Sequence, residues 1–167
     1  MRRLVLVVAI VILAAALAPT QITRAGTLRI SNSSARSQVY GDGMSVYSSG
    51  GCQDRYNSTC TSLEQVHQHT INGIITLHHA CGYCTIVITG GTEVGHASGT
   101  YSHWNGYKLD IRHYSGVDSY IKGHFSYIGL RGDGAPQWKS ASGNIYADEG
   151  SHWDILYYNC GGCGSSA

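Results

Sequence analysis

The sequence predicts an α+β domain in which a small, mostly antiparallel sheet carries one long and one short helix. From residue 61 onward, apolar residues recur at spacings of three and four, which is typical of an amphipathic helix. Residues 115–125 show a similar pattern over a shorter length. Residues 107–113 and 152–158 instead alternate apolar and polar side chains, as strands with one buried face do.

The long helix is expected to begin at Thr61 or Ser62. Thr61 and Glu64 match a capping box, in which each side chain bonds the backbone N–H of the other residue. The apolar face continues to residue 78. The histidines of this segment do not share one helical face, so we interpret them as solvated or packing side chains. They are His67, His69, His78 and His79.

The strands are expected to form one sheet. Residues 85–89 are β-branched throughout and predict a short buried strand that ends at Gly90 and Gly91. In residues 107–113, Leu109 and Ile111 face one side and Asp110 faces the other, so Asp110 can point into a cleft. A strand at residues 127–130 and a hairpin at residues 139–145 complete the expected sheet.

Residues 1–26 are expected to be a signal peptide or an N-terminal anchor. Arg2 and Arg3 precede an uninterrupted apolar run at residues 4–18, which is shorter than the about 20 residues of a membrane span. We therefore expect a secreted or extracytoplasmic protein of the cell envelope. It would meet a membrane only through an uncleaved N-terminal segment. Residues 27–60 are polar and small, and predict a linker or lightly ordered arm before a domain at residues 61–167.

Charge and cysteine content bear on the expected partners and on the state of the cysteines. Three of the 11 Lys and Arg residues lie in residues 1–26, and no basic run occurs, so nucleic acid is not an expected partner. Six cysteines behind an export signal predict disulfides. The alternatives are redox activity or a structural zinc held by Cys81, Cys84, Cys160 and Cys163. Each of these two pairs could also close locally.

Two segments carry the candidate chemistry. His103 stands seven residues before Asp110, with Gly106 between them. Near the end of the chain, Glu149 stands three residues before His152. Two imidazoles and a carboxylate match the three protein ligands of a catalytic zinc, which leaves the fourth position to water. We assign His103, Asp110 and His152 as ligands of one zinc ion per chain.

Glu149 is then the carboxylate available as the general base, which takes a proton from water and passes it to the leaving amine. Glu149 and His152 would point in opposite directions on a regular strand. A bend is therefore expected between them, and Gly150 permits one.

The order H-x6-D, with a glycine three residues after the histidine, then E-x-x-H, resembles the zinc D-Ala-D-Ala peptidases of the Hedgehog/DD-peptidase fold. The resemblance covers about residues 63–158 and implies that fold. In the family, the residues at the positions of His103, Asp110 and His152 bind zinc, and the residue at the position of Glu149 is the catalytic base. The resemblance implies a cell-wall carboxypeptidase or endopeptidase that hydrolyses D-Ala-containing stem peptides of peptidoglycan.

The sequence departs from the family at positions that face the substrate. Tyr101 stands where a serine is usual, with Ser102 next to it, and Lys108 stands where a small residue is common. The upstream arginine that meets the substrate carboxylate has no counterpart in residues 89–93, and Arg131 is a candidate replacement. These departures leave two alternatives. One is a catalytically inactive, zinc-containing binding module of the same fold, and the other is a disulfide-stapled structural protein.

Further residues are candidates for substrate contact or for supporting the ligands. His96 is interpreted as a hydrogen-bonded loop histidine, a supporting residue or a ligand. Glu93 is interpreted as a loop carboxylate that faces water. Asp154 shares a strand face with His152 and is a candidate to hold the outer ring nitrogen of a liganding histidine. Ser102 is a candidate substrate contact.

Overall fold

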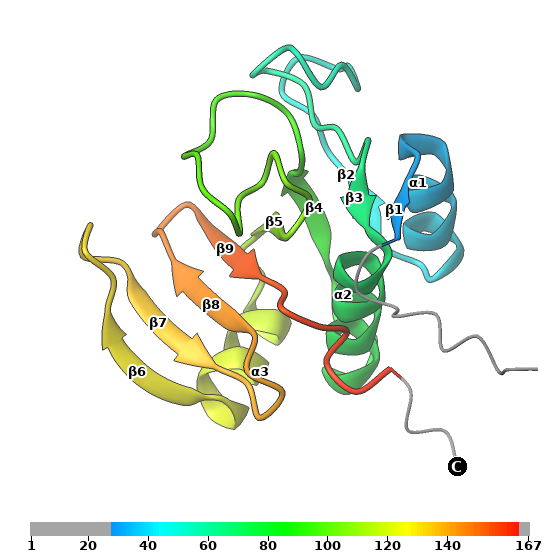
Figure 1. Ribbon diagram of the computed structural model, residues 1–167. Helices are drawn as coiled ribbons and strands as arrows, with labels where there is room; N and C mark the ends of the chain where they lie inside the picture. The colour runs from blue at the N-terminus through cyan, green and yellow to red at the C-terminus, as the bar shows by residue number, and fades with distance from the viewer. Residues whose placement is uncertain (1–27, 164–167) are drawn as a thin grey trace, which may run out of the picture.

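The computed structural model describes residues 28–163 (Figure 1). The predicted signal peptide or anchor at residues 1–26 lies outside the described residues. Between residues 28 and 163, no helix is long and apolar enough to cross a membrane.

The main sheet has seven strands in the order β2-β4-β5-β9-β8-β7-β6. β2 runs parallel to β4, and the other neighbours are antiparallel. The strands are β2 (Ser45–Val46), β4 (Val87–Gly90), β5 (Lys108–Arg112), β6 (Ser126–Leu130), β7 (Pro136–Lys139), β8 (Ile145–Asp148) and β9 (His152–Leu156). A second, two-stranded sheet pairs β1 (Arg29–Ile30) with β3 (Val66–His67). The helices are α1 (Asn32–Gly41), α2 (Gln68–Ala80) and α3 (Ser115–His124).

The predicted fold of a small, mostly antiparallel sheet with two helices is therefore wrong. The main sheet is large and mixed, a second sheet is present, and there are three helices among the described residues. Most of the difference lies in residues 27–60, which were expected to be a linker. This segment supplies β1, α1 and β2, and α1 buries Ala35 and Val39. Its polar composition concealed these elements because two buried apolar side chains are enough to dock a short helix.

The long helix also begins later than the capping box predicts. α2 starts at Gln68, and its N-cap residue makes no side-chain hydrogen bond. The single hydroxyl proton of Thr61 is instead shared between the carbonyl oxygens of Tyr47 at 2.8 Å and Thr89 at 2.9 Å. Glu64 accepts the backbone N–H of Asn32 at 2.7 Å. Both side chains therefore bind distant segments, which a local sequence pattern does not reveal.

The alternation of the two central strands is confirmed. Leu109 and Ile111 of β5 are fully buried on the core face, and Asp110 lies on the other face. On β9, Trp153 and Ile155 take the core face, and Asp110 pairs with Asp154 across the two strands. The shorter helix, predicted at residues 115–125, is present as α3.

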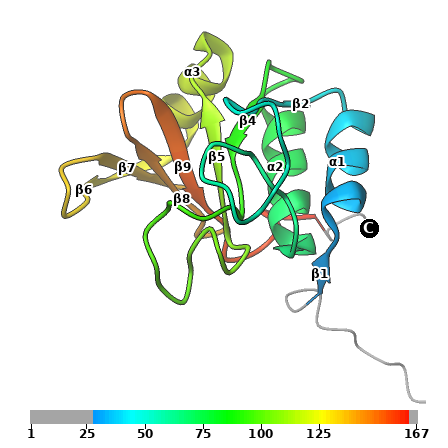
Figure 2. The ribbon, with the colours of Figure 1, turned by 90° about the horizontal axis from the view of Figure 1, so that it is seen from above.

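The helices lie against the core face of the sheet, and a long loop extends from β4 to β5. One hydrophobic core joins residues of α2 and α3 to those of β5 and β9. α1 lies beside α2 at the β2 end of the sheet (Figures 1 and 2). The loop at residues 91–107 projects beyond the strands (Figure 1). Residues of this loop, Gly95, His96, Ala97 and His103, line a cavity together with residues of β5 and β9.

Three disulfides close short segments of the chain. They join Cys52 to Cys60, Cys81 to Cys84 and Cys160 to Cys163, and no described cysteine is free. The prediction of disulfides is confirmed, and the structural zinc held by four thiolates is excluded because each pair closes locally. Disulfides persist in oxidising compartments, so these three fit an extracellular protein.

Gly73 on α2 tests the packing of this core. A Cβ at Gly73 would collide with the fully buried ring of Tyr157. We expect Gly73→Ala to lower the free energy of unfolding by about 1–3 kcal/mol, as overpacking does, despite the better helix propensity of alanine. Gly123 on α3 is the matched control, because a Cβ there meets nothing within 4 Å. Gly123→Ala should raise stability by up to about 1 kcal/mol, and denaturant unfolding measures both. Equal effects of the two changes would contradict this packing.

Candidate metal site

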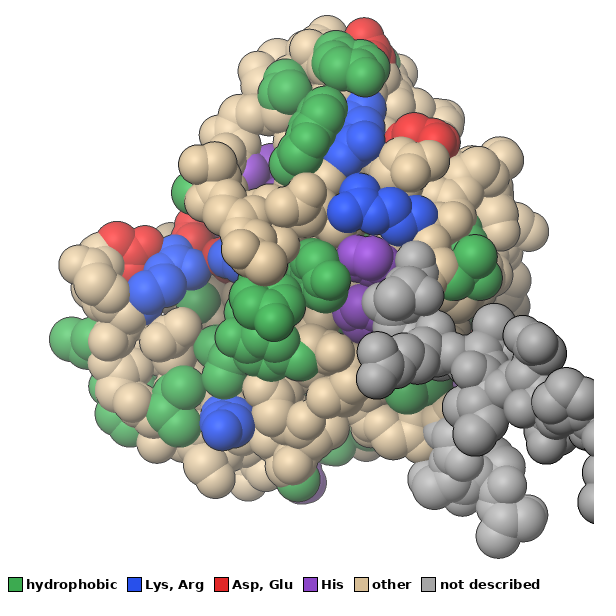
Figure 3. Space-filling view, in the orientation of Figure 1, with side chains coloured by type: hydrophobic (Ala, Val, Ile, Leu, Met, Phe, Trp, Pro, Cys, Tyr) green, Lys and Arg blue, Asp and Glu red, His purple; other side chains and the backbone are tan. Residues whose placement is uncertain are grey.

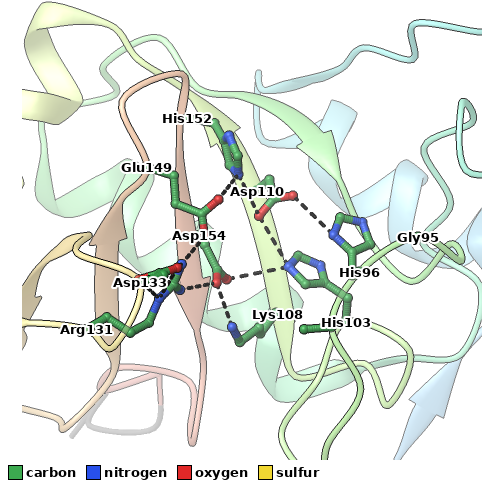
Figure 4. Close-up of a pocket in the computed structure, with 11 residues that line it drawn as sticks. Gly95, His96, His103, Lys108, Asp110, Arg131, Asp133, Glu149, His152 and Asp154 are labelled. Carbon is green, nitrogen blue, oxygen red and sulfur yellow. Dashed lines mark hydrogen bonds and ion pairs between the residues drawn. The ribbon is translucent and has the colours of Figure 1, made fainter.

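A cavity of about 440 Å³ opens on the face of β5 and β9 opposite the core (Figure 4). Its lining residues are Gly95, His96, Ala97, His103, Lys108, Asp110, Arg131, Asp133, Glu149, His152 and Asp154. The structure thus brings the three predicted ligands and the predicted base around one space. His96, Arg131 and Asp154 also line the cavity. Ser102 does not: it is buried in a turn, where its hydroxyl accepts the backbone N–H of Asn105.

Asp110 lies between the two predicted imidazole ligands. Its Oδ1 is 3.2 Å from Nε2 of His103 and 3.6 Å from Nε2 of His152. This oxygen is buried and has no hydrogen-bond partner among the described residues. Two ligands of a tetrahedral zinc, each about 2.0–2.1 Å from the ion, lie about 3.3 Å apart, so each of these two spacings between Asp110 and a histidine is close to that of a pair of zinc ligands.

The loop before β5 fixes the ring orientation of His103. Nδ1 of His103 lies 2.7 Å from the carbonyl oxygen of Gly91. A carbonyl only accepts, so Nδ1 carries a proton and donates it. The neutral imidazole then presents the lone pair of Nε2 to Asp110. The Gly106 N–H closes the following turn by donating to the His103 carbonyl at 2.8 Å, and the φ of +80° at Gly106 favours glycine.

Two glycines at the end of β4 allow this close approach. Gly90 pairs with Asp110, and a Cβ at Gly90 would collide with the Asp110 carboxylate. A Cβ at Gly91 would collide with the carbonyl of Ser62. Their role in the site was missed, because the sequence indicates them only as the end of a strand. A glycine pair at a strand end before the site loop is the signal that could have revealed it.

The β8–β9 turn brings Glu149 beside His152. Gly150 has a φ of +77°, which gives the bend expected from the sequence. The Glu149 N–H donates to the His152 carbonyl at 3.0 Å. As a result, Oε2 of Glu149 lies 3.2 Å from Nε2 of His152. The other ring nitrogen of His152 lies 2.8 Å from the Ser151 hydroxyl.

Asp154 occupies a different place from the one predicted. The outer ring nitrogens of His103 and His152 meet Gly91 and Ser151, so Asp154 does not hold either of them. Instead, its Oδ1 lies 3.5 Å from the inner Nε2 of His103. Like Oδ1 of Asp110, this oxygen is buried without a hydrogen-bond partner among the described residues.

Two cations hold the other oxygen of Asp154. Lys108 Nζ lies 2.6 Å away and Arg131 Nη1 lies 2.7 Å away. Arg131 also donates to Asp133 and Glu149 (Figure 4). Acidic and basic side chains lie side by side at the left of the surface in Figure 3. Hydrogen bonds to Asp133, and then to Glu149 and Asp154, raise the pKa of Arg131 further above its usual range, although burial opposes this.

The inner nitrogen of His103 therefore faces two carboxylates in a buried space. Burial alone would lower the pKa of His103, but the nearby carboxylates of Asp110, and then of Asp154, favour a proton on Nε2 and raise the pKa to about 10. The Nε2 lone pair and the two carboxylate oxygens repel one another unless a cation lies between them. That cation is either a proton on Nε2 or a metal ion.

The residues present fit a divalent metal. Imidazole nitrogens and carboxylate oxygens are ligands that zinc accepts. The cavity has four carboxylates, from Asp110, Asp133, Glu149 and Asp154, against the two fixed cations of Lys108 and Arg131. One divalent ion would balance this excess of negative charge.

His96 lies beside this site and contacts Glu93. The interpretation of Glu93 as a carboxylate that faces water is wrong. Glu93 is only 3% exposed and accepts the backbone N–H groups of Ser62 and Gly91. Burial alone would raise the pKa of Glu93, but the hydrogen bonds from His96, Ser62 and Gly91 lower it below its usual range. The candidate ligand atoms of His96, His103 and Asp110 all lie within 4.8 Å of one another.

A second His/Asp cluster lies between α1 and α2. It consists of Asp42, His78 and His79, whose candidate ligand atoms also lie within 4.8 Å of one another. Each histidine already makes a hydrogen bond to its own oxygen of Asp42, at 2.8 Å for His78 and 2.7 Å for His79. These bonds leave neither carboxylate oxygen unpaired, and the cluster joins the ends of the two helices.

Searches of protein-family models, curated proteins and solved structures found no match to this chain. The resemblance to the zinc D-Ala-D-Ala peptidases therefore depends on the motif residues themselves.

The pairing of His103 predicts how stability changes with pH when metal is removed by a chelator. Its pKa of about 10 in the folded protein lies above the ordinary 6.5. The stabilisation is therefore fully present below pH 6.5 and is lost as the pH rises through 10. Denaturant unfolding over this range should show a loss on the order of a few kcal/mol relative to a His103→Gln variant.

The exposed His124 lies outside the cavity, and a His124→Gln control should keep the wild-type pH dependence. Unfolding profiles that run parallel for the wild type and His103→Gln would contradict the pairing of His103 with two buried carboxylates.

Proposed function

We propose that this protein is a zinc-dependent peptidase that hydrolyses D-Ala-containing stem peptides of peptidoglycan outside the membrane. The observation that carries the proposal is that Nε2 of His103 and Nε2 of His152 both lie close to the buried, unpaired Oδ1 of Asp110, in the lining of an open cavity. The chemical class of the substrate comes from the resemblance of the two motifs to the D-Ala-D-Ala peptidases.

In this proposal, His103, Asp110 and His152 hold the ion. When bound, zinc polarises the scissile carbonyl and lowers the pKa of water to about 7. Its three protein ligands come from a glycine-bounded loop and two paired strands, so the positions of the ligands are fixed by the core of the sheet.

Glu149 is the proposed general base. It lines the cavity on a tight turn, and its side chain is 31% exposed, so a substrate and water can reach it. Oε2 faces the ligand His152, and the Arg131 guanidinium holds Oε1. The ion pair orients the Glu149 carboxylate, which can accept a proton from water and transfer it to the leaving amine.

Lys108 is better placed than Arg131 to meet a substrate carboxylate. Arg131 donates to three carboxylates of the protein, which use most of its N–H groups. Among the described residues, Asp154 is the carboxylate partner of Lys108 Nζ, and the Lys108 side chain is 22% exposed in the cavity. An ammonium has three donors, so two remain for a ligand.

The assay is release of D-alanine or of a new amine from a synthetic stem peptide by the zinc-loaded protein. Glu149→Gln should keep its bound zinc and lose turnover by a factor on the order of 100–10,000, because a general base is removed while the ligands remain. Asp54→Asn changes an exposed carboxylate outside the cavity and should leave turnover unchanged.

Turnover by Glu149→Gln at the wild-type rate would contradict its role as base. A zinc-loaded wild type that binds the stem peptide but hydrolyses none would contradict the peptidase and support the zinc-containing binding module instead.

A further inference from the structure

We propose that His96 is a fourth metal ligand of this site, held in place by the buried carboxylate of Glu93. The inference rests on the proposed zinc site and adds a residue to it. In the resting protein, four side chains would then surround the ion, and His96 would be the ligand that leaves when a substrate enters.

The first support is the orientation of the His96 ring. Nε2 of His96 lies 3.1 Å from Oε1 of Glu93. An ionised carboxylate only accepts, so this nitrogen carries the proton and the lone pair of a neutral ring is on Nδ1. A carboxylate that holds the outer nitrogen is the usual partner of a metal-binding histidine, because it fixes the tautomer and strengthens the ligand.

The second support is what Nδ1 of His96 faces. It points into the cavity toward Oδ2 of Asp110 at 3.8 Å, which is too long for a hydrogen bond (Figure 4). Lone pairs of the two atoms therefore face each other, as they do at His103. The His96 and His103 rings stack with centroids 3.8 Å apart and an interplanar angle of 15°. Nδ1 of His96 and Nε2 of His103 thus face the two oxygens of the same carboxylate.

The third support is the cost of burying Glu93. A buried carboxylate is unfavourable unless it is paired and hydrogen-bonded. Backbone N–H groups of Ser62 and Gly91 satisfy part of it, and His96 is its one ion-pair partner among the described residues. A metal on Nδ1 would place positive charge on that ring and so compensate the charge of Glu93.

The glycines around His96 and its exposure explain why His96 would be the ligand that leaves the ion when a substrate binds. Gly95 has a φ of +109° and Gly99 a φ of +151°, so glycines bracket His96 in the loop. His96 is 26% exposed, whereas His103 is 5% exposed at its side chain. A peptidase needs one open position on its zinc. The loop that carries His96 can open that position without moving β5 or β9.

The test is the zinc dissociation constant, measured by competition with a chromophoric chelator, for the wild type and three variants. His96→Ala should weaken zinc binding by a factor on the order of 10–100, and Glu93→Gln should weaken it in the same direction. His124→Ala, which changes an exposed histidine outside the cavity, should bind as the wild type does. Circular dichroism checks that each variant is folded.

If the wild type binds zinc and His96→Ala binds it equally well, His96 is not a ligand and this inference fails while the proposed peptidase stands. If the wild type binds no zinc, both fail. Should Glu93→Gln not fold, the partly exposed His96→Ala variant decides alone. Turnover provides a second readout, since saturating zinc should restore activity to His96→Ala if the residue only binds the ion, and loss of activity despite saturation would contradict that role.

Discussion

The site is built around His103, where buried hydrogen-bond acceptors face one another and repel unless a cation lies between them. Its Nδ1 donates to the Gly91 carbonyl, and its Nε2 therefore faces Oδ1 of Asp110 and Oδ1 of Asp154. Neither carboxylate oxygen has a hydrogen-bond partner among the described residues. Such an arrangement is costly unless a cation lies at its centre. At neutral pH a proton on His103 supplies this positive charge. A zinc ion would supply it too, and would bind His152 as a further ligand.

The fold makes this arrangement possible by pairing β5 with β9. Asp110 and Asp154 lie opposite each other on these strands, and their neighbours Leu109 and Ile155 are fully buried in the core. The carboxylates are thus fixed by the same packing that stabilises the sheet. Gly90 leaves room for the Asp110 carboxylate against β4. The loop at residues 91–107 and the β8–β9 turn then add the histidines and Glu149 from either side.

The features of the fold and the site that depend on local sequence pattern could be predicted from the sequence. Strand alternation placed Leu109 in the core and Asp110 opposite it, and Gly150 indicated the bend that brings Glu149 to His152. Interactions between distant segments could not be predicted. The capping box at Thr61 was wrong because the Thr61 hydroxyl lies against the carbonyl oxygens of Tyr47 and of Thr89 in β4. The burial of Glu93 was missed because backbone N–H groups from two segments surround it.

The zinc site can be tested by diffraction data collected at the zinc absorption edge from crystals grown with zinc. We expect an anomalous peak bounded by Nε2 of His103, the Asp110 carboxylate and Nε2 of His152. Zinc found only at the cluster of Asp42, His78 and His79, or no ordered zinc in the cavity, would contradict it.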